Sequence, residues 1–224
     1  MDNAPAAVPF AARPVAAPGK LPVLPRPDAR IGLYGGTFDP PHLGHLALAL
    51  AALAALKLDQ LFFIPAAQAP LRSAPAVASV ADRLEMLRRA VAEAADPRLA
   101  VLDIEARADG VNYTVDTLRQ LRAAWPGAQF YFLLGADQFS RLPLWREPEA
   151  LAQLVEFAVF DRPGADAALP SPPLVSQLRW QRIASAPHPA SSSEIRRRLH
   201  ARQNADDWLP RSVAAYIEEK KLYR

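Results

Sequence analysis

The residues of this chain best suited to chemistry are two histidines, His42 and His45, which close the segment GGTFDPPHLGH at residues 35–45. They stand three residues apart, so on a helical turn both imidazoles share a face. Imidazoles donate hydrogen bonds and carry a charge when a nearby phosphate raises their pKa. We therefore expect this pair to bind a polyphosphate.

A strand, a tight turn and a helix are predicted to position these histidines. Residues 31–34 form a short apolar run before the turn, and residues 46–56 form a longer run after it. Gly35 and Gly36 allow a close approach of the backbone to a ligand. The helix N-terminus and the N–H groups of the turn then meet at the carboxyl end of a strand, where a phosphate can sit. The alternative is a glycine turn followed by surface histidines.

A second anion site is predicted at residues 190–196, ASSSEIR. Ser191, Ser192 and Ser193 precede an apolar, arginine-bearing run, which is typical of a helix N-terminus with hydroxyl caps and free N–H groups. Arg196 would lie on the first turn of this helix. The serines alone would indicate a capped helix, but with the first segment they favour a second phosphate site.

The first segment resembles the signature of the nucleotidyltransferase superfamily that carries the His-x-Gly-His motif. The matching positions are Gly36, Phe38, Pro40, His42, Gly44 and His45. Members join a nucleoside triphosphate to a phosphate-bearing acceptor and release pyrophosphate. The resemblance implies a catalytic role for Thr37, His42 and His45. The ATP-binding residues that it implies in this segment are Gly35, Gly36 and Phe38.

The serine segment resembles the Ile-Ser-Ser-Thr-x-Ile-Arg motif, which grips the triphosphate in that superfamily. Ala190 replaces the usual isoleucine, and Ser193 replaces the threonine but keeps the hydroxyl. The resemblance implies that Arg196 acts in catalysis. It implies that the ATP phosphates are bound by Ser191, Ser192 and Ser193.

Three further stretches resemble the nicotinate mononucleotide branch. Arg72 matches the basic position of its Pro-Pro-His-Lys/Arg phosphate loop, whereas Leu71 replaces the histidine. Thr114 lies in a Tyr-Thr-x-x-Thr-Leu segment whose backbone helps to hold the nicotinate carboxylate. Asp137, in a Gly-x-Asp segment, is implied to bind ribose, and Trp145 to stack on the pyridine ring. From the residues alone, Thr114 and Asp137 also fit helix caps, and Trp145 also fits the core.

The remaining pattern predicts an α/β fold. Apolar runs at 60–64, 99–104, 129–134, 156–160 and 179–184 predict further strands. Helices are predicted at 43–57, 80–94, 114–124, 148–154, after the serines and at 209–222. For the helix at 80–94, Ser79 is the predicted N-cap, and Leu84, Leu87 and Val91 form the predicted apolar stripe. Strand–helix–strand units of this length favour a parallel sheet. We expect a Rossmann-like, doubly wound, mostly parallel sheet in a single domain with helices on both faces.

Composition narrows the class of protein. Hydrophobic residues make up 51% of the 224 residues, the formal net charge is +3, and there is no cysteine. We expect residues 1–29, rich in Pro and Ala, to be a disordered extension, with a partner-binding tail as the alternative, and residues 30–224 to form the nucleotidyltransferase domain. The mild charge and short apolar runs predict a cytoplasmic protein that binds neither nucleic acid nor membrane. The oligomeric state stays open, a homo-oligomer included.

The resemblance as a whole, which covers about residues 30–224, implies a bacterial type of nicotinate-nucleotide adenylyltransferase. Its partners would be ATP and nicotinate mononucleotide, and its cofactor would be Mg²⁺ with few or no protein ligands. Its products would be pyrophosphate and nicotinate adenine dinucleotide, a precursor of NAD. An acceptor phosphate is already ionised at neutral pH, so catalysis would consist of positioning and charge stabilisation. The alternatives are transfer to nicotinamide mononucleotide or phosphopantetheine, and a non-catalytic nucleotide-binding protein.

Overall fold

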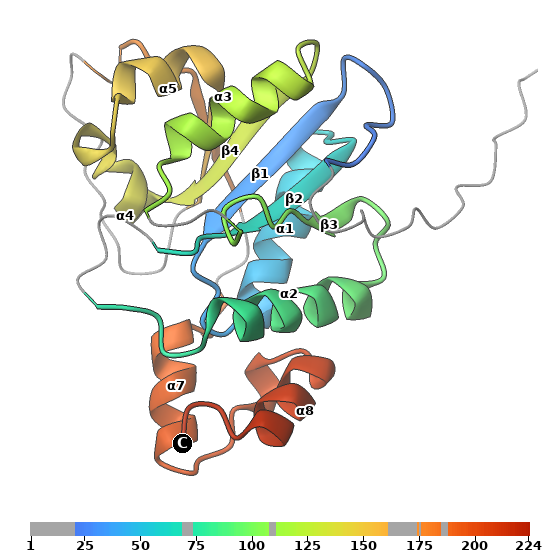
Figure 1. Ribbon diagram of the computed structural model, residues 1–224, viewed down its shortest axis with the longest axis vertical. Helices are drawn as coiled ribbons and strands as arrows, with labels where there is room; N and C mark the ends of the chain where they lie inside the picture. The colour runs from blue at the N-terminus through green and yellow to red at the C-terminus, as the bar shows by residue number, and fades with distance from the viewer. Residues whose placement is uncertain (1–20, 69–73, 108–110, 161–173, 175, 185–187) are drawn as a thin grey trace, which may run out of the picture.

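The computed structural model describes residues 21–68, 74–107, 111–160, 174, 176–184 and 188–224. Within them, six parallel strands form one sheet in the order β3-β2-β1-β4-β5-β6 (Figure 1). The strands are β1 (Arg30–Gly36), β2 (Gln60–Pro65), β3 (Leu99–Val101), β4 (Gln129–Gly135), β5 (Glu156–Phe160) and β6 (Trp180–Ile183). The strand order reverses at β1, which lies between β2 and β4. Ligands of such sheets bind outside the carboxyl ends of the strands at this reversal.

Helices cover both faces of the sheet. They are α1 (Leu43–Ala55), α2 (Val80–Ala94), α3 (Thr114–Ala124), α4 (Ala136–Phe139), α5 (Pro148–Leu154), α7 (Ser192–His200) and α8 (Arg211–Lys220), with 3-10 turns at Leu142–Leu144 and Asp206–Trp208. On β1, Ile31 and Leu33 join a core cluster with α3 and α5, whereas Tyr34 joins a cluster with α1, α2 and α8. This alternation explains why the strands read as continuous apolar runs. The predicted doubly wound sheet is confirmed.

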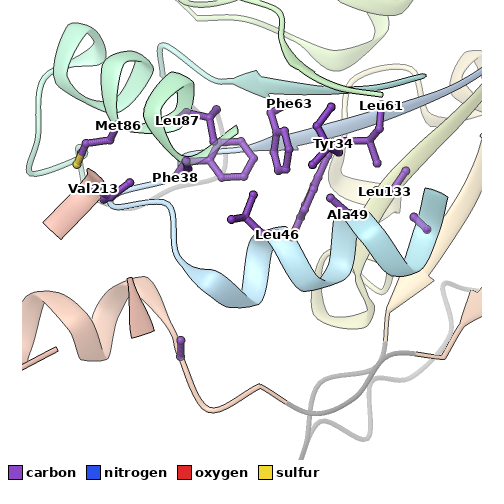
Figure 2. Close-up of a cluster of buried hydrophobic side chains, with 14 of the residues drawn as sticks. Tyr34, Phe38, Leu46, Ala49, Leu61, Phe63, Met86, Leu87, Leu133 and Val213 are labelled. Atoms are coloured by element: carbon purple, nitrogen blue, oxygen red, sulfur yellow. The ribbon is translucent and has the colours of Figure 1, made fainter. Parts of the chain in front are cut away.

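Figure 2 shows the cluster between the sheet and α1 and α2. The rings of Tyr34 and Phe63, from neighbouring strands, lie 5.5 Å apart, and Leu46 and Ala49 of α1 pack over them. Phe38, in the turn after β1, fills the end of the same cluster. The turn that precedes α1 is therefore anchored in the core.

Two predicted boundaries differ in the structure. The strand predicted at 99–104 ends at Val101, because the last ladder bond runs from Leu102 N–H to the carbonyl of Phe63 and the chain then leaves the sheet. The N-cap of α3 is Tyr113, and Thr114 is the first helical residue. The predicted Ser79 cap of α2 is confirmed, since its Oγ accepts a hydrogen bond from the Asp82 N–H.

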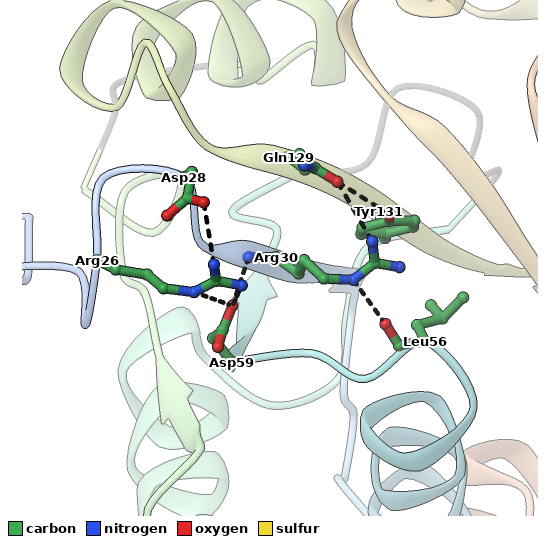
Figure 3. Close-up of polar contacts among 7 residues, drawn as sticks. All are labelled: Arg26, Asp28, Arg30, Leu56, Asp59, Gln129 and Tyr131. Carbon is green, nitrogen blue, oxygen red and sulfur yellow. Dashed lines mark hydrogen bonds and ion pairs between the residues drawn. The ribbon is translucent and has the colours of Figure 1, made fainter. Parts of the chain in front are cut away.

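Residues 21–29 pack against the domain, although the sequence predicts disorder up to residue 29. Leu21 and Leu24 lie on the α3 side of the core. Figure 3 shows Arg26 donating to Asp59 Oδ2, which also accepts the Arg30 N–H at 2.8 Å. The Arg30 guanidinium lies 4.7 Å above the Tyr131 ring. These contacts lie at the amino ends of β1 and β4, away from the ligand edge.

The rest of the predicted extension, residues 1–20, lies outside the described residues, and the domain boundary at residue 30 stays a prediction. In the described part of the chain, no helix combines the length and hydropathy needed to cross a membrane.

Candidate active site

A cavity of about 1160 Å³ opens at the carboxyl ends of β1 and β4, where the strand order reverses. Most of the predicted site residues line it. They are Gly35, Gly36, Thr37, Phe38, His42, His45, Thr114, Asp137, Trp145, Ser191, Ser192, Ser193 and Arg196. The tertiary structure thus brings together four stretches of chain that the sequence separates. Arg72 and Leu71 lie outside the described residues.

The two histidines stack on each other at the start of α1. Their ring centroids are 3.7 Å apart with an interplanar angle of 26°. His42 is the N-cap of α1, and its backbone N–H donates to Nδ1 of His45 at 3.2 Å. Because Nδ1 accepts this bond, a neutral His45 carries its proton on Nε2. The half-buried His45 can therefore donate from Nε2 to a phosphate oxygen.

Phe38 packs against the His45 imidazole. Its ring meets the His45 ring edge-on, at 5.0 Å and 75°. The residue has a φ of 50°, a left-handed conformation unusual for a bulky side chain, and only 2% of it is exposed. A Cβ on Gly36 would lie 2.9 Å from Phe38 Cζ. The glycine therefore makes room for the ring that holds His45, and Phe38 reaches the cavity mainly as support for the histidine.

Two buried charged residues that the sequence analysis missed hold the turn in place. Arg83 of α2 donates to the carbonyls of Thr37, Ala66 and Ala67, at 2.7, 2.8 and 3.2 Å. Asp39, 1% exposed, accepts hydrogen bonds from the loop before α2. The predicted apolar stripe of α2 is wrong in part: the buried residues are Arg83, Met86, Leu87 and Ala90. A buried arginine bound to carbonyls breaks the apolar period, so periodicity could not reveal it.

The serine segment adjoins the histidine segment. Ser191 caps α7, with its Oγ accepting from the Glu194 N–H at 3.3 Å. Ser192 Oγ donates to the carbonyl of Pro40 at 2.9 Å, and Arg196 Nη1 donates to the carbonyl of Asp39 at 2.6 Å. The N-termini of α1 and α7 therefore open onto one cavity, and both favour an anion there.

The start of α3 forms another wall of the cavity. Thr114 is its first residue, and Thr117 Oγ1 donates to Glu105 Oε1 at 2.8 Å. Burial raises the pKa of the Glu105 carboxyl, while this hydrogen bond acts in the opposite direction. Glu105 and Asn112 line the cavity, and neither was predicted. The sequence signal for Glu105 was an acidic residue shortly before the Tyr-Thr segment, but residues 105–110 have the composition of a polar turn.

Asp137 and Trp145 line the cavity beyond β4. Gly135 is the N-cap of α4, so Asp137 lies in the first turn and the N-cap alternative for it is wrong. Trp145 is half-buried, and its ring stands nearly perpendicular to that of Phe132, at 5.9 Å and 88°. A half-buried indole that lines a cavity suits contact with a flat ring.

Comparison with known proteins assigns the family. Residues 33–198 match the cytidylyltransferase-like family. A probable nicotinate-nucleotide adenylyltransferase from Shouchella clausii is 41% identical over 194 residues, which cover 87% of this chain and 96% of that protein. The chain belongs to the nicotinate-nucleotide adenylyltransferase family.

Other relatives agree. A probable nicotinate-nucleotide adenylyltransferase from Bordetella petrii is 44% identical over 200 residues, 87% of this chain and 99% of that protein. The structure of Plasmodium falciparum nicotinic acid mononucleotide adenylyltransferase complexed with NaAD matches with a TM-score of 0.69 at 20% identity, over 87% of this chain and 97% of that chain. At this identity, the likeness to the Plasmodium falciparum structure shows that the fold is shared. Membership of the nicotinate-nucleotide adenylyltransferase family confirms the predicted resemblance and enzyme class.

The sequence analysis of this nicotinate-nucleotide adenylyltransferase family member also missed His188, another cavity residue. His188 lines the cavity just before the serines, and its Nδ1 accepts the Ala190 N–H at 3.1 Å. A Cβ on Gly44 would lie 3.4 Å from His188 Cγ, so this imidazole lies next to the histidine segment. Its sequence position, outside both recognised motifs, carried no signal.

Proposed function

We propose that the protein transfers the adenylyl group of ATP to the phosphate of nicotinate mononucleotide. The observation that carries this proposal is the convergence of two helix N-termini, those of α1 and α7, with Arg196 and His45 on one cavity. Such an arrangement stabilises a polyphosphate more strongly than any single element would. The same cavity extends to Thr114 and Trp145, which gives an acceptor room beside the triphosphate.

The reaction requires in-line attack by an acceptor phosphate oxygen on the α-phosphorus. A P–O bond to the acceptor forms, the bond to the bridging α–β oxygen breaks, and pyrophosphate leaves with that electron pair. No proton has to be removed from the ionised nucleophile. In this proposal Nε2–H of His45 donates to an α-phosphate oxygen as charge develops, with Thr37 and His42 beside it.

The departing pyrophosphate would be bound by the second segment. Ser191 and the N–H groups of α7 face the cavity, and Arg196 brings a positive charge to it. Ser192 and Ser193 complete this wall, and Arg72 would add a second charge. A guanidinium binds phosphate oxygens through two parallel hydrogen bonds.

The acceptor would lie between α3 and the segment after β4. N–H groups at the start of α3, around Thr114, suit the nicotinate carboxylate. Asp137 would accept hydrogen bonds from ribose hydroxyls, and Trp145 would stack on the pyridine ring. The positive end of the α3 dipole favours a carboxylate over a neutral amide.

Mg²⁺ fits this site as a companion of ATP. Within the described residues there is no group of three or more His, Asp or Glu side chains arranged to hold a metal ion. Asp39 lines the cavity, but its carboxylate already accepts three hydrogen bonds from the protein. Phosphate oxygens and water would supply ligands to the ion, which would neutralise charge on the triphosphate.

Pyrophosphate release in the presence of ATP and Mg²⁺ tests the proposal. The acceptors to compare are nicotinate mononucleotide, nicotinamide mononucleotide and phosphopantetheine, each over a range of concentrations. We expect kcat/KM to be highest with nicotinate mononucleotide. A preference for either of the others would overturn the acceptor assignment, and ATP binding without pyrophosphate release would favour a non-catalytic nucleotide-binding protein.

A further inference from the structure

The segment that follows α8 returns to the turn that bears the histidines. Leu222 N–H donates to the carbonyl of Ile217, which closes α8, and Tyr223 then enters the core with 7% of its surface exposed. Its hydroxyl donates to Asp39 Oδ1 at 2.9 Å, across 184 residues of sequence. Figure 1 shows this segment lying beside α7, the helix that carries Arg196. Tyr223, which belongs to neither the histidine motif nor the serine motif, thus contacts the phosphate segment, residues 35–45.

The Asp39 carboxylate accepts three hydrogen bonds. Oδ1 accepts from Tyr223 and from the Ala78 N–H at 3.1 Å, and Oδ2 accepts from the Val77 N–H at 2.8 Å. Burial and the Asp39 carboxylate raise the pKa of the Tyr223 phenol, so it remains a donor at neutral pH. A buried carboxylate requires such donors, because each missing one leaves charge uncompensated.

Arg196 forms a long ion pair with this carboxylate, but its hydrogen bond goes to the backbone. Its Nη1 donates to the backbone carbonyl of Asp39 at 2.6 Å and stays 3.8 Å from Oδ2. The side chain of Arg196 is 21% exposed, and the residue lines the cavity. Since hydrogen bonds satisfy the carboxylate, the guanidinium can direct its remaining N–H groups to a ligand.

We propose that Tyr223 is a positioning residue for ATP: by donating to Asp39, it keeps the carboxylate from drawing Arg196 out of the cavity. Without the hydroxyl, Oδ1 loses a donor, and the less compensated carboxylate would draw Arg196, now 3.8 Å from Oδ2, into a direct hydrogen-bonded ion pair of about 2.8 Å. The triphosphate would then compete with Asp39 for Arg196. This inference rests on the proposed function for the place of the triphosphate.

Tyr223→Phe tests the proposal, because phenylalanine keeps the ring and removes the donor. We expect the KM for ATP to rise roughly three- to tenfold, the range that one charge-assisted hydrogen bond supports. The KM for nicotinate mononucleotide should stay within about twofold, since the acceptor end lies away from Arg196, whereas kcat should also fall because Arg196 is proposed to bind the departing pyrophosphate. A Tyr223→Phe protein with an unchanged KM for ATP, or with both KM values raised alike, would overturn the proposal.

Tyr216→Phe is the matched control. Tyr216 lies on α8, and its hydroxyl donates to Asp82 Oδ1 at 2.9 Å, a similar phenol–carboxylate bond that does not touch the phosphate segment. Both variants should lose comparable thermal stability, but only Tyr223→Phe should change the KM for ATP. An equal change in the control would indicate a general effect of loosening α8 and would contradict a positioning role.

A double-mutant cycle with Arg196→Met identifies the route of the effect. If Tyr223 acts through Arg196, Tyr223→Phe should change ATP binding less than about twofold in the Arg196→Met background. An undiminished effect there would overturn the proposed route. Calorimetric titration with ATP and Mg²⁺, without any acceptor, measures the ATP affinity of the same variants. The inference can therefore be tested even if the acceptor assignment fails.

Discussion

His45 is oriented by the backbone and the core together. The His42 N–H donates to Nδ1 of His45, and the Phe38 and His45 rings pack in a T-shaped pair, so Nε2 has a defined direction. The sequence motif implies a role for His45, but it does not show which ring nitrogen donates to the ligand. At the scale of single residues, the chemistry is thus decided by one hydrogen bond and one ring contact.

His45→Ala should lower kcat by about 100-fold or more, the effect of removing one donor to a transition-state charge. The KM for ATP should change less than about threefold, because many other groups bind the ground-state triphosphate. Steady-state pyrophosphate release measures both constants. His200→Ala is the control, since His200 is exposed at the far end of α7. A rise in KM alone would show that His45 binds ATP without stabilising the transition state.

Glu105 predicts a pH dependence of stability. Burial raises the pKa of this carboxyl above its ordinary value of 4.5, so the native protein keeps the proton at pH values where the unfolded chain has released it. The resulting stabilisation is complete below pH 4.5 and is lost as the pH rises through the native pKa. Glu105→Gln, which can still accept from Thr117, should lack this loss.

Urea unfolding between about pH 4 and 8 compares the two proteins. As the pH rises, the free energy of unfolding of the parent protein should decrease relative to that of Glu105→Gln. A constant difference across this range would contradict the assignment.

At the scale of elements, the site depends on how helices are fastened to the turn. The N-termini of α1, α3 and α7 all open onto the cavity, but none of them bonds the Thr37 carbonyl. That contact comes from Arg83 in the interior of α2, which also binds Ala66 and Ala67 after β2. The helix therefore acts as a clamp between the ends of two neighbouring strands.

Arg83→Lys should lower the free energy of unfolding by about 3 kcal/mol, because an ammonium cannot bind three carbonyls from the fork of a guanidinium. Arg89→Lys on the same helix is the control. Arg89 pairs with Glu85 at 2.8 Å in a more exposed position, so its replacement should cost less than about 0.5 kcal/mol. Chemical denaturation followed by circular dichroism measures both. Equal losses would mean that Arg83 does not clamp the turn.

At the scale of the whole molecule, α8 and the segment after it bind the first half of the chain. Tyr216 reaches Asp82 on α2, and Tyr223 reaches Asp39 in the turn. Figure 2 shows Val213 of α8 near Met86 of α2, in the cluster that also contains Phe38. Contacts of such long sequence separation make the phosphate segment depend on the folding of the complete domain.

These tyrosines predict an alkaline limit to stability. Burial and the Asp82 carboxylate raise the pKa of Tyr216 to about 12, against an ordinary value of 10.0. The native phenol keeps its proton while the unfolded one ionises, so the stabilisation is complete below pH 10.0 and is lost as the pH rises through about 12. Urea unfolding at intervals across this range should show a smaller decline for Tyr216→Phe than for the parent protein. An equal decline in both would refute this contribution.

The order of elements, the class of sheet and the two segments proposed to bind phosphate were predictable from local sequence patterns. Apolar runs, glycine turns and serine caps act over a few residues, so they can be recognised without knowledge of the fold. Ser79 as a cap and the strands around β1 and β4 were predictable for this reason. Charged core residues were not, because their partners are distant in sequence.

The surroundings of those segments depend on the folded arrangement of the whole chain. Arg83 binds carbonyls far from α2 in sequence, Glu105 meets Thr117 where a strand was expected to end, and Tyr223 completes the donors of Asp39. Each is a polar group that becomes favourable in the interior only when a partner from another element reaches it. A linear pattern carries residue types and local spacing, whereas the pairing of buried polar groups exists only once the chain has folded.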